Sequence, residues 1–280
     1  MSIKELADDA LYLKNNGKYN SALSLMCLAI AGSSRLMYPS GTKSVSNKND
    51  SMRDNEAFKI CLNIMLSKVV LGCRDEIPQS PDITRFDFRG KESSLSAVLY
   101  EHYRCNLIHE ASLPSYIHFV EEIEESKVNL TLNNCTFGTY RDEAYLSYEW
   151  IDFLYDGLAL LFCNASEFGV EHYDLVLRDG SDKKSFIDQI CSKFDVSFGR
   201  VEYLMHYLNI GKNYERDFNK VTSQQISAEF EELVREGVFT GVHRTPFRSQ
   251  GIIDLEHQFT EKGMNLIKEM SGKFNKVKIA

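Results

Sequence analysis

Apolar residues recur at three- and four-residue spacing in successive segments near the N-terminus, and turn-forming residues separate these segments. Residues 3–14, 19–38 and 54–71 all show this spacing, which places the apolar side chains on one face of a helix. Asn15-Asn16-Gly17 and Pro39-Ser40-Gly41 lie between the segments, as expected where helices end. Because short connections join such helices, the N-terminal part is expected to form an antiparallel bundle.

The second of these segments also carries small residues at positions that face a neighbouring helix. Ala22, Ala29, Gly32 and Ser33 would allow that neighbour to approach closely. A fourth helix is expected to begin near Ser94, after a connection that contains proline, and it includes the polar stretch LYEHYRCNLIHEASLP.

The hydrophobic period changes after this fourth helix. Residues 128–132 alternate between apolar and polar side chains, and residues 135–140 and 143–148 supply two further short strands around turns. Residues 149–163 return to helical spacing. The sequence therefore predicts a small β-hairpin as an elaboration of the helical bundle.

A polar, glycine-containing segment at residues 178–182 suggests a domain boundary, with one domain at 1–178 and a second at 179–280. The second domain is expected to contain helices near 183–194 and 198–209, and a third after Thr222-Ser223. A long hairpin over 238–260 and a last helix would follow, which is the element order of winged-helix domains. The predicted fold class is mainly α, with a helical bundle followed by a winged-helix-like α+β domain.

Charge and cysteine content limit the functions that the chain is expected to have. Residues 181–280 hold 15 Lys and Arg against 14 Asp and Glu, which leaves 17 against 26 in residues 1–180. An acidic first domain repels phosphate at long range, so nucleic acid chemistry there requires a local pocket or a dimer groove. The seven scattered cysteines contain no C-x-x-C pair and there is no apolar run long enough to cross a membrane, so a cytoplasmic protein is expected.

Arg104 and His109 form an R-x4-H pair within the fourth helix. This pair of residue types suits RNA cleavage without a metal ion. Histidine titrates near neutrality and exchanges a proton with the ribose 2′-hydroxyl or the leaving oxygen. Arginine binds the phosphate and stabilises the charge of the transition state. Two pairs across a two-fold axis would supply one histidine as base and the other as acid.

Spacing alone does not identify a site. Arg200 and His206 form a second, R-x5-H match, which is interpreted as part of a packing helix that buries Val201, Leu204 and Leu208. A structural alternative also exists for the first pair, namely a salt bridge to Glu101 or Glu110. In a regular α-helix, positions five apart lie about 140° apart around the axis, so the two side chains would meet only through a distortion or the length of the arginine.

The context of the first pair resembles the HEPN family, helical domains of which many cleave RNA and carry R-x4-6-H. The similar features are the Gly17-Lys18-Tyr19 turn before an Ala/Leu-rich second helix and the stretch around Arg104 and His109. The resemblance covers residues 3–165. It implies that Arg104 and His109 are catalytic in a homodimer, with Cys105, Asn106 and Glu110 as supporting residues.

In the winged-helix-like domain, Arg244 and Arg248 are candidates for nucleic-acid contacts from the wing. The candidate recognition helix carries four glutamates, which would repel phosphate, so a protein-binding or dimerising wing is the favoured interpretation. These glutamates are Glu229, Glu231, Glu232 and Glu236.

Three functions therefore follow from the sequence. The first is a HEPN-like, metal-independent endoribonuclease that acts as a homodimer, in bacterial stress or phage defence. The second is a non-catalytic module that scaffolds or regulates a protein partner, and the third is a DNA-binding regulator. No cofactor and no metal are expected, because the histidines and cysteines lack zinc-site spacing and no phosphate-binding glycine loop is present.

Overall fold

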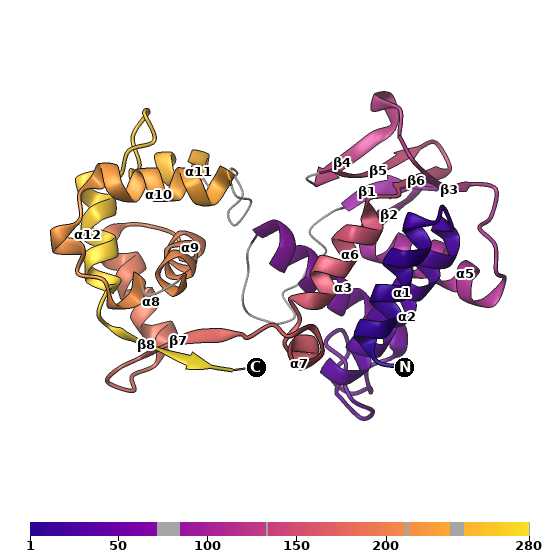
Figure 1. Cartoon of the computed structure of the whole chain (residues 1–280), viewed down its shortest axis with the longest axis horizontal. Helices are drawn as coiled ribbons and strands as arrows, with labels where there is room; N and C mark the ends of the chain where they lie inside the picture. Colours follow the sequence, from indigo (N-terminus) through magenta and orange to yellow (C-terminus); the bar gives the residue numbers. More distant parts are fainter. Residues whose placement is uncertain (72–84, 133, 211–212, 236–243, 280) are drawn as a thin grey trace. The chain divides into compact units, whose positions relative to one another are not determined.

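The computed structural model describes residues 1–71, 85–132, 134–210, 213–235 and 244–279. The chain divides into two compact units, Met1–Val170 and Glu171–Ala280 (Figure 1). The described residues are mainly helical with a smaller β component, as the sequence predicted. None of their helices has the length and apolar character needed to cross a bilayer.

Four helices form the framework of the first unit. Ser2 caps the first of them, since its hydroxyl accepts a hydrogen bond from Glu5 N while the Glu5 carboxylate accepts one from Ser2 N. The expected helices over the first seventy residues are confirmed. The helices are α1 (Ile3–Asn15), α2 (Tyr19–Met37), α3 (Asp54–Leu71) and α6 (Trp150–Ala159).

Close packing of these helices depends on two glycines. A Cβ atom at Gly32 of α2 would lie 2.4 Å from Ile3 Cδ1, and one at Gly157 of α6 would lie 2.9 Å from Met65 Cβ. The expectation that small residues of the second helix allow a close neighbour is therefore confirmed. The core around them is apolar and includes the fully buried Phe58 and Trp150.

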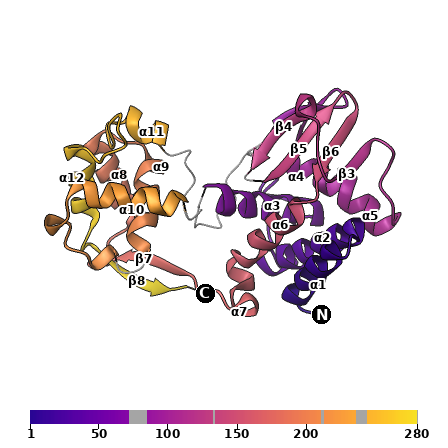
Figure 2. The ribbon, with the colours of Figure 1, turned by 45° about the horizontal axis from the view of Figure 1, so that its top comes forward.

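A four-stranded sheet covers these helices on one side, as Figures 1 and 2 show, in the order β3–β6–β5–β4. The strands predicted at residues 128–132, 135–140 and 143–148 are confirmed, and β3 was not predicted. It pairs with β6 in parallel, whereas the other pairs are antiparallel. The strands are β3 (Ile117–Val120), β4 (Val128–Leu132), β5 (Cys135–Tyr140) and β6 (Glu143–Ser147), with a 3₁₀ turn, η2 (Glu125–Lys127), before β4.

A separate hairpin precedes the fourth helix of the sequence. Strands β1 (Arg85–Phe88) and β2 (Lys91–Ser94) pair in antiparallel register, in a segment that the sequence suggested to be only a connection. The helix that follows begins at Leu95, directly after Ser94 as expected. It consists of three consecutive parts, α4 (Leu95–Val98), the π-helical turn η1 (Leu99–Arg104) and α5 (Cys105–His109).

The boundary between the units differs from the expected one after residue 178. The first unit closes with η3 (Phe162–Asn164) and α7 (Ala165–Phe168). Strand β7 (Tyr173–Leu177) then pairs with β8 (Phe274–Lys278), so its residues belong to the second unit. The boundary between the two units therefore lies after Val170.

The second unit packs its helices around a core of its own. The helices expected near 183–194, 198–209 and after Thr222-Ser223 are confirmed. The elements between the two strands are α8 (Lys183–Phe194), α9 (Phe198–Asn209), η4 (Asn213–Glu215), η5 (Phe218–Lys220), α10 (Ser223–Arg235), α11 (Arg244–Ser249) and α12 (Glu261–Met270).

The prediction of a long hairpin over residues 238–260 is wrong for the part of this segment that the structure describes. Residues 238–243 lie outside the described residues, and Arg244–Ser249 form α11. Pro246 fits there because the first turn of a helix needs no donor from its backbone nitrogens. An isolated bridge between Ile253 and Phe259 is the β pairing in the remainder of this segment.

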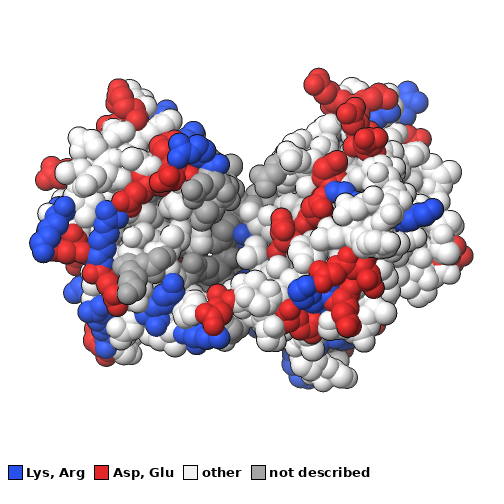
Figure 3. Space-filling model, viewed as in Figure 1, with Lys and Arg blue, Asp and Glu red and all other residues white. Residues whose placement is uncertain are grey.

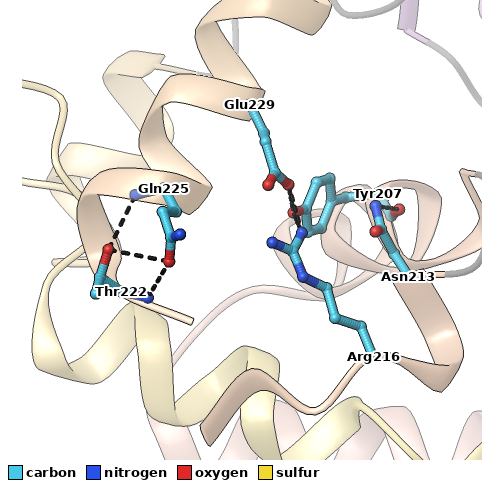
Figure 4. A network of polar contacts seen from close by, with 6 residues as sticks. All are labelled: Tyr207, Asn213, Arg216, Thr222, Gln225 and Glu229. Carbon is cyan, nitrogen blue, oxygen red and sulfur yellow. Dashed lines mark hydrogen bonds and ion pairs between the residues drawn. The ribbon is translucent and has the colours of Figure 1, made fainter. Parts of the chain in front are cut away.

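An ionic network fastens α9 to α10 in the second unit (Figure 4). Arg216 Nη1 lies 2.7 Å from Glu229 Oε2, and the Tyr207 hydroxyl donates to the same oxygen at 2.5 Å. Burial raises the pKa of the Glu229 carboxyl, but the hydrogen bonds from Arg216 and Tyr207 outweigh it and hold that pKa below its usual value. Thr222 and Gln225 cap α10 reciprocally beside this network.

Candidate functional site

The helical stretch that carries Arg104 and His109 is anchored to the core of the first unit. Ser94 caps its start, because its hydroxyl accepts a hydrogen bond from Ala97 N at 3.2 Å. Leu99 and Tyr103 are buried, and the Tyr103 hydroxyl donates to the carbonyl oxygen of His118 on β3 at 2.8 Å. The inner face of this helix is therefore fixed, and its other face carries the candidate residues.

The helix departs from α geometry directly before the candidate pair. The Cys105 amide donates to the carbonyl oxygen of Tyr100, five residues earlier, which defines the wider π-helical turn. The Asn106 side chain donates to the carbonyl oxygen of His102 at 2.7 Å and so satisfies an acceptor in this widened turn. Single π-helical turns of this kind occur frequently at functional sites.

Arg104 and His109 lie in contact. The Nη1 atom of Arg104 is 3.4 Å from Nε2 of His109, although the two positions lie on different sides of a regular helix. Arg104 is half-buried, and His109, the last residue of α5, is exposed. The contact places a group that can bind phosphate beside a group that can transfer a proton.

The structural alternative for this pair, a salt bridge to Glu101 or Glu110, is wrong. Glu101 pairs instead with Lys59 on α3 at 2.7 Å, and Arg104 makes no ion pair within the residues that the structure describes. The Arg104 guanidinium lies 5.3 Å from the centre of the Tyr100 ring. Its Nε is buried and has no acceptor among the described residues.

The three expected supporting residues lie near the pair but do not orient the histidine. Cys105 Sγ is 4.0 Å from Arg104 Nη1, and Asn106 is used within the helix. Glu110 is exposed, and its backbone oxygen accepts a hydrogen bond from Ser112. His109 Nδ1 has no hydrogen-bond partner within the described part of the chain.

A second thiol lies close to Arg104 on the inner side. Cys27 of α2 is fully buried, and burial raises the pKa of its thiol to about 12. The positive charge of Arg104 opposes this shift, and the Cys105 thiol adds to it. The candidate arginine therefore has an uncharged thiol behind it and not a carboxylate.

The aromatic surroundings of His102 were not predicted from the sequence. Its ring meets Phe88 and Tyr116 edge to face, and Arg89 lies 4.3 Å above the Tyr116 ring. Burial lowers the pKa of His102, and the charge of Arg89 lowers it further against the opposing effect of Glu101. These contacts of His102 could not be predicted, because Phe88 and Arg89 belong to the β1–β2 hairpin, which was not expected from the sequence.

The other sequence candidates lie in the second unit. Arg244 and Arg248 lie on α11 and not on strands of a wing, because that segment is helical. Arg200 and His206 lie on α9, whose residues Val201, Leu204 and Leu208 are fully buried, so the packing interpretation of that helix is confirmed.

Acidic side chains gather on the first unit in the view of Figure 3, including at the outer end of its sheet. This agrees with the excess of Asp and Glu over Lys and Arg in the N-terminal part of the sequence. On the first unit, the basic side chains in this view are scattered among the acidic ones and form no continuous patch. The six cysteines that the structure describes are free thiols.

A family model described as Rv1289 matches residues 2–156, more than half of the chain. The matched segment includes the complete helical stretch with Arg104 and His109 and ends within the first unit. No curated protein and no solved structure matches the chain.

Proposed function

The chain belongs to the Rv1289 family, and we propose that its first unit cleaves RNA without a metal ion. Arg104 and His109 are the reacting groups. The observation that carries the proposal is the contact of 3.4 Å between Arg104 Nη1 and His109 Nε2, at a widened helical turn. Neither group is used in an ion pair within the described residues, so both are available to a substrate.

The proposed reaction begins when a phosphodiester takes the place of His109 beside Arg104. A phosphate offers several acceptor oxygens to the guanidinium. His109 Nε2, released from this contact, accepts the proton of the ribose 2′-hydroxyl. The 2′-oxygen attacks phosphorus, and the bond from phosphorus to the 5′-oxygen breaks, which leaves a 2′,3′-cyclic phosphate.

The leaving 5′-oxygen requires a proton at the same time. One His109 cannot act as base and acid in a single step, so we propose that a second copy of the chain provides the second histidine across a two-fold axis. The two guanidinium groups would then share the negative charge of the transition state. A homodimer is therefore part of the proposal. The cytoplasmic location expected from the sequence is also part of it.

The test uses purified protein with structured and unstructured RNA in the presence of EDTA. We expect the wild type to produce fragments with 2′,3′-cyclic phosphate ends, and the double substitution Arg104→Ala/His109→Ala to abolish them. Loss of general acid–base catalysis alone lowers a rate by about 100-fold or more. The matched control is Arg200→Ala/His206→Ala, which removes the same residue types from the other R-x-H match and is expected to leave cleavage unchanged.

Equal absence of cleavage in the wild type and the double variant, across several RNAs, would contradict the enzyme proposal. It would favour the second candidate, a non-catalytic module that binds a protein partner. The observation that favours this candidate is the free Nδ1 of His109, because a catalytic imidazole is usually oriented through its second nitrogen.

A further inference from the structure

We propose that the second unit contains a phosphate-binding site formed by Arg244, Arg248 and His257. The side chains come from two segments that are separate in the sequence, α11 and the turn before α12. A fourth residue, Glu231 on α10, lies among them: it forms an ion pair with Arg244, and its Oε1 lies 3.9 Å from His257 Nδ1. The site is independent of the pair proposed for RNA cleavage in the first unit.

His257 lies between a guanidinium and a carboxylate. Arg248 Nη2 is 2.9 Å from Nε2 of the imidazole, and Glu231 Oε1 is 3.9 Å from Nδ1. Arg248 therefore contacts one nitrogen of the imidazole, and the Glu231 carboxylate lies on the side of the other.

Arg244 completes the cluster from the other side of Glu231. Its guanidinium forms an ion pair with Glu231 Oε2, so one carboxylate serves both Arg244 and His257. The Nε of Arg244 is buried and has no acceptor among the described residues. Arg248 is exposed and has no carboxylate partner in the described part of the chain. Arg244 is therefore paired with a carboxylate, whereas the partner of Arg248 in this cluster is the His257 imidazole.

The backbone at His257 is held in an unfavourable conformation. Its φ angle is +60°, in the left-handed region that residues with a side chain seldom adopt. A tight turn fixes this conformation, since Gln258 N donates to the Asp254 carboxylate at 2.8 Å and Asp254 N donates to the Gln258 carbonyl oxygen at 2.9 Å. The turn therefore fixes where the imidazole lies beside Arg248.

The donors of this cluster match a phosphate group better than a carboxylate. A carboxylate has two oxygens, which one arginine fork occupies, whereas a phosphate has a further oxygen for a second donor. A bound phosphate would take the place of His257 beside Arg248.

The experiment uses the full chain with Arg104→Ala and His109→Ala, so that the first unit contributes no phosphate contact. Isothermal titration measures the binding of inorganic phosphate, a nucleoside 5′-monophosphate and a short single-stranded RNA. We expect Arg248→Gln to weaken binding of the probes that bind by about tenfold, because one charged hydrogen bond is lost. The matched control, Arg235→Gln, changes an exposed arginine of α10 and should leave every affinity unchanged.

The three probes distinguish the source of the phosphate. Binding of the small anions would identify a free phosphate or nucleotide as the ligand, whereas binding of RNA alone would identify a nucleic acid backbone. Arg248→Lys keeps the charge but loses the planar fork, and it provides the measurement if Arg248→Gln does not fold. Absence of binding by all three probes, or equal affinities of the Arg248 and Arg235 variants, would overturn the proposal.

Discussion

Replacing Arg216 by methionine should destabilise the second unit while leaving the first unit unchanged. The substitution keeps the length of the side chain but removes the charge that holds the Glu229 carboxylate. Glu229 would then keep only the hydrogen bond from the Tyr207 hydroxyl.

The size of the effect follows from the exposure of the pair. Breaking a buried ion pair costs about 3–5 kcal/mol, and breaking an exposed one costs at most about 1 kcal/mol. The Arg216 and Glu229 side chains are 29% and 35% exposed, which places them between these limits. We therefore expect a loss of about 2 kcal/mol, or a decrease in melting temperature of about 10 °C for a unit of this size.

The effect should depend on pH in one direction. The pKa of Glu229 is lower in the folded unit than its usual value, so its ion pair stabilises the fold above that usual value. This stabilisation is lost as the pH falls through the folded pKa. The difference between wild type and Arg216→Met should accordingly be complete at pH 7 and decrease in acid.

The assay is thermal unfolding followed by two signals. The single tryptophan, Trp150, lies in the first unit, so its fluorescence reports on that unit, whereas circular dichroism reports on both. We expect Arg216→Met to shift a dichroism transition but not the fluorescence transition. The control is Arg235→Gln, whose side chain is 76% exposed and should have little effect. A loss below about 0.5 kcal/mol at pH 7 would refute the reasoning.

Two further outcomes test the packing of the first unit. Gly138→Ala should destabilise it by about 1–3 kcal/mol in fluorescence-detected unfolding, because the new Cβ would lie 2.2 Å from the Lys127 carbonyl oxygen. The control is Gly199→Ala in the second unit, followed by circular dichroism, because its Cβ would meet nothing within 4 Å; an equal loss of stability from both substitutions would contradict the expected clash. Cys27 should resist alkylation by iodoacetamide in the native protein at pH 8, because burial raises the pKa of its thiol to about 12, whereas the half-exposed Cys105 should react. Rapid modification of Cys27, detected by mass spectrometry, would show that this interpretation is wrong.

The helices were largely predictable from the sequence because their signal is local. The apolar spacing within α1, α2 and α3 and the breakers between them are sufficient to place these helices. Strand β3 could not be placed in this way. It has four residues, and its stability depends on parallel pairing with β6, which lies after two other strands in the sequence.

The hairpin expected over residues 238–260 failed for a different reason. Its middle segment contains Pro246, which a strand interior rejects but the first turn of a helix accepts. Alternation between apolar and polar residues was therefore outweighed locally by the helical turn of α11. Arg244 and Arg248 therefore lie on a helix and not on the strands of the expected wing.

The two candidate sites differ in how far they could be predicted from the sequence. Arg104 and His109 are five residues apart on one helix, so their pairing could be proposed, but their contact depends on a helix end and the reach of one side chain. The cluster around His257 could not be proposed. Its members come from α10, α11 and a turn, and only the packing of the second unit brings them together.

The pairing of β7 with β8 has a mechanical consequence. Tyr173 lies opposite Lys278, and Ile279 N donates to the carbonyl oxygen of His172, so the first residue of β7 and the last residue of β8 are direct neighbours. A force that pulls these ends apart acts perpendicular to the strands and loads one pair of hydrogen bonds at a time. The second unit should therefore open like a zipper at low force, beginning at Lys278, and its helical core would be exposed only after Leu177 and Phe274 have separated.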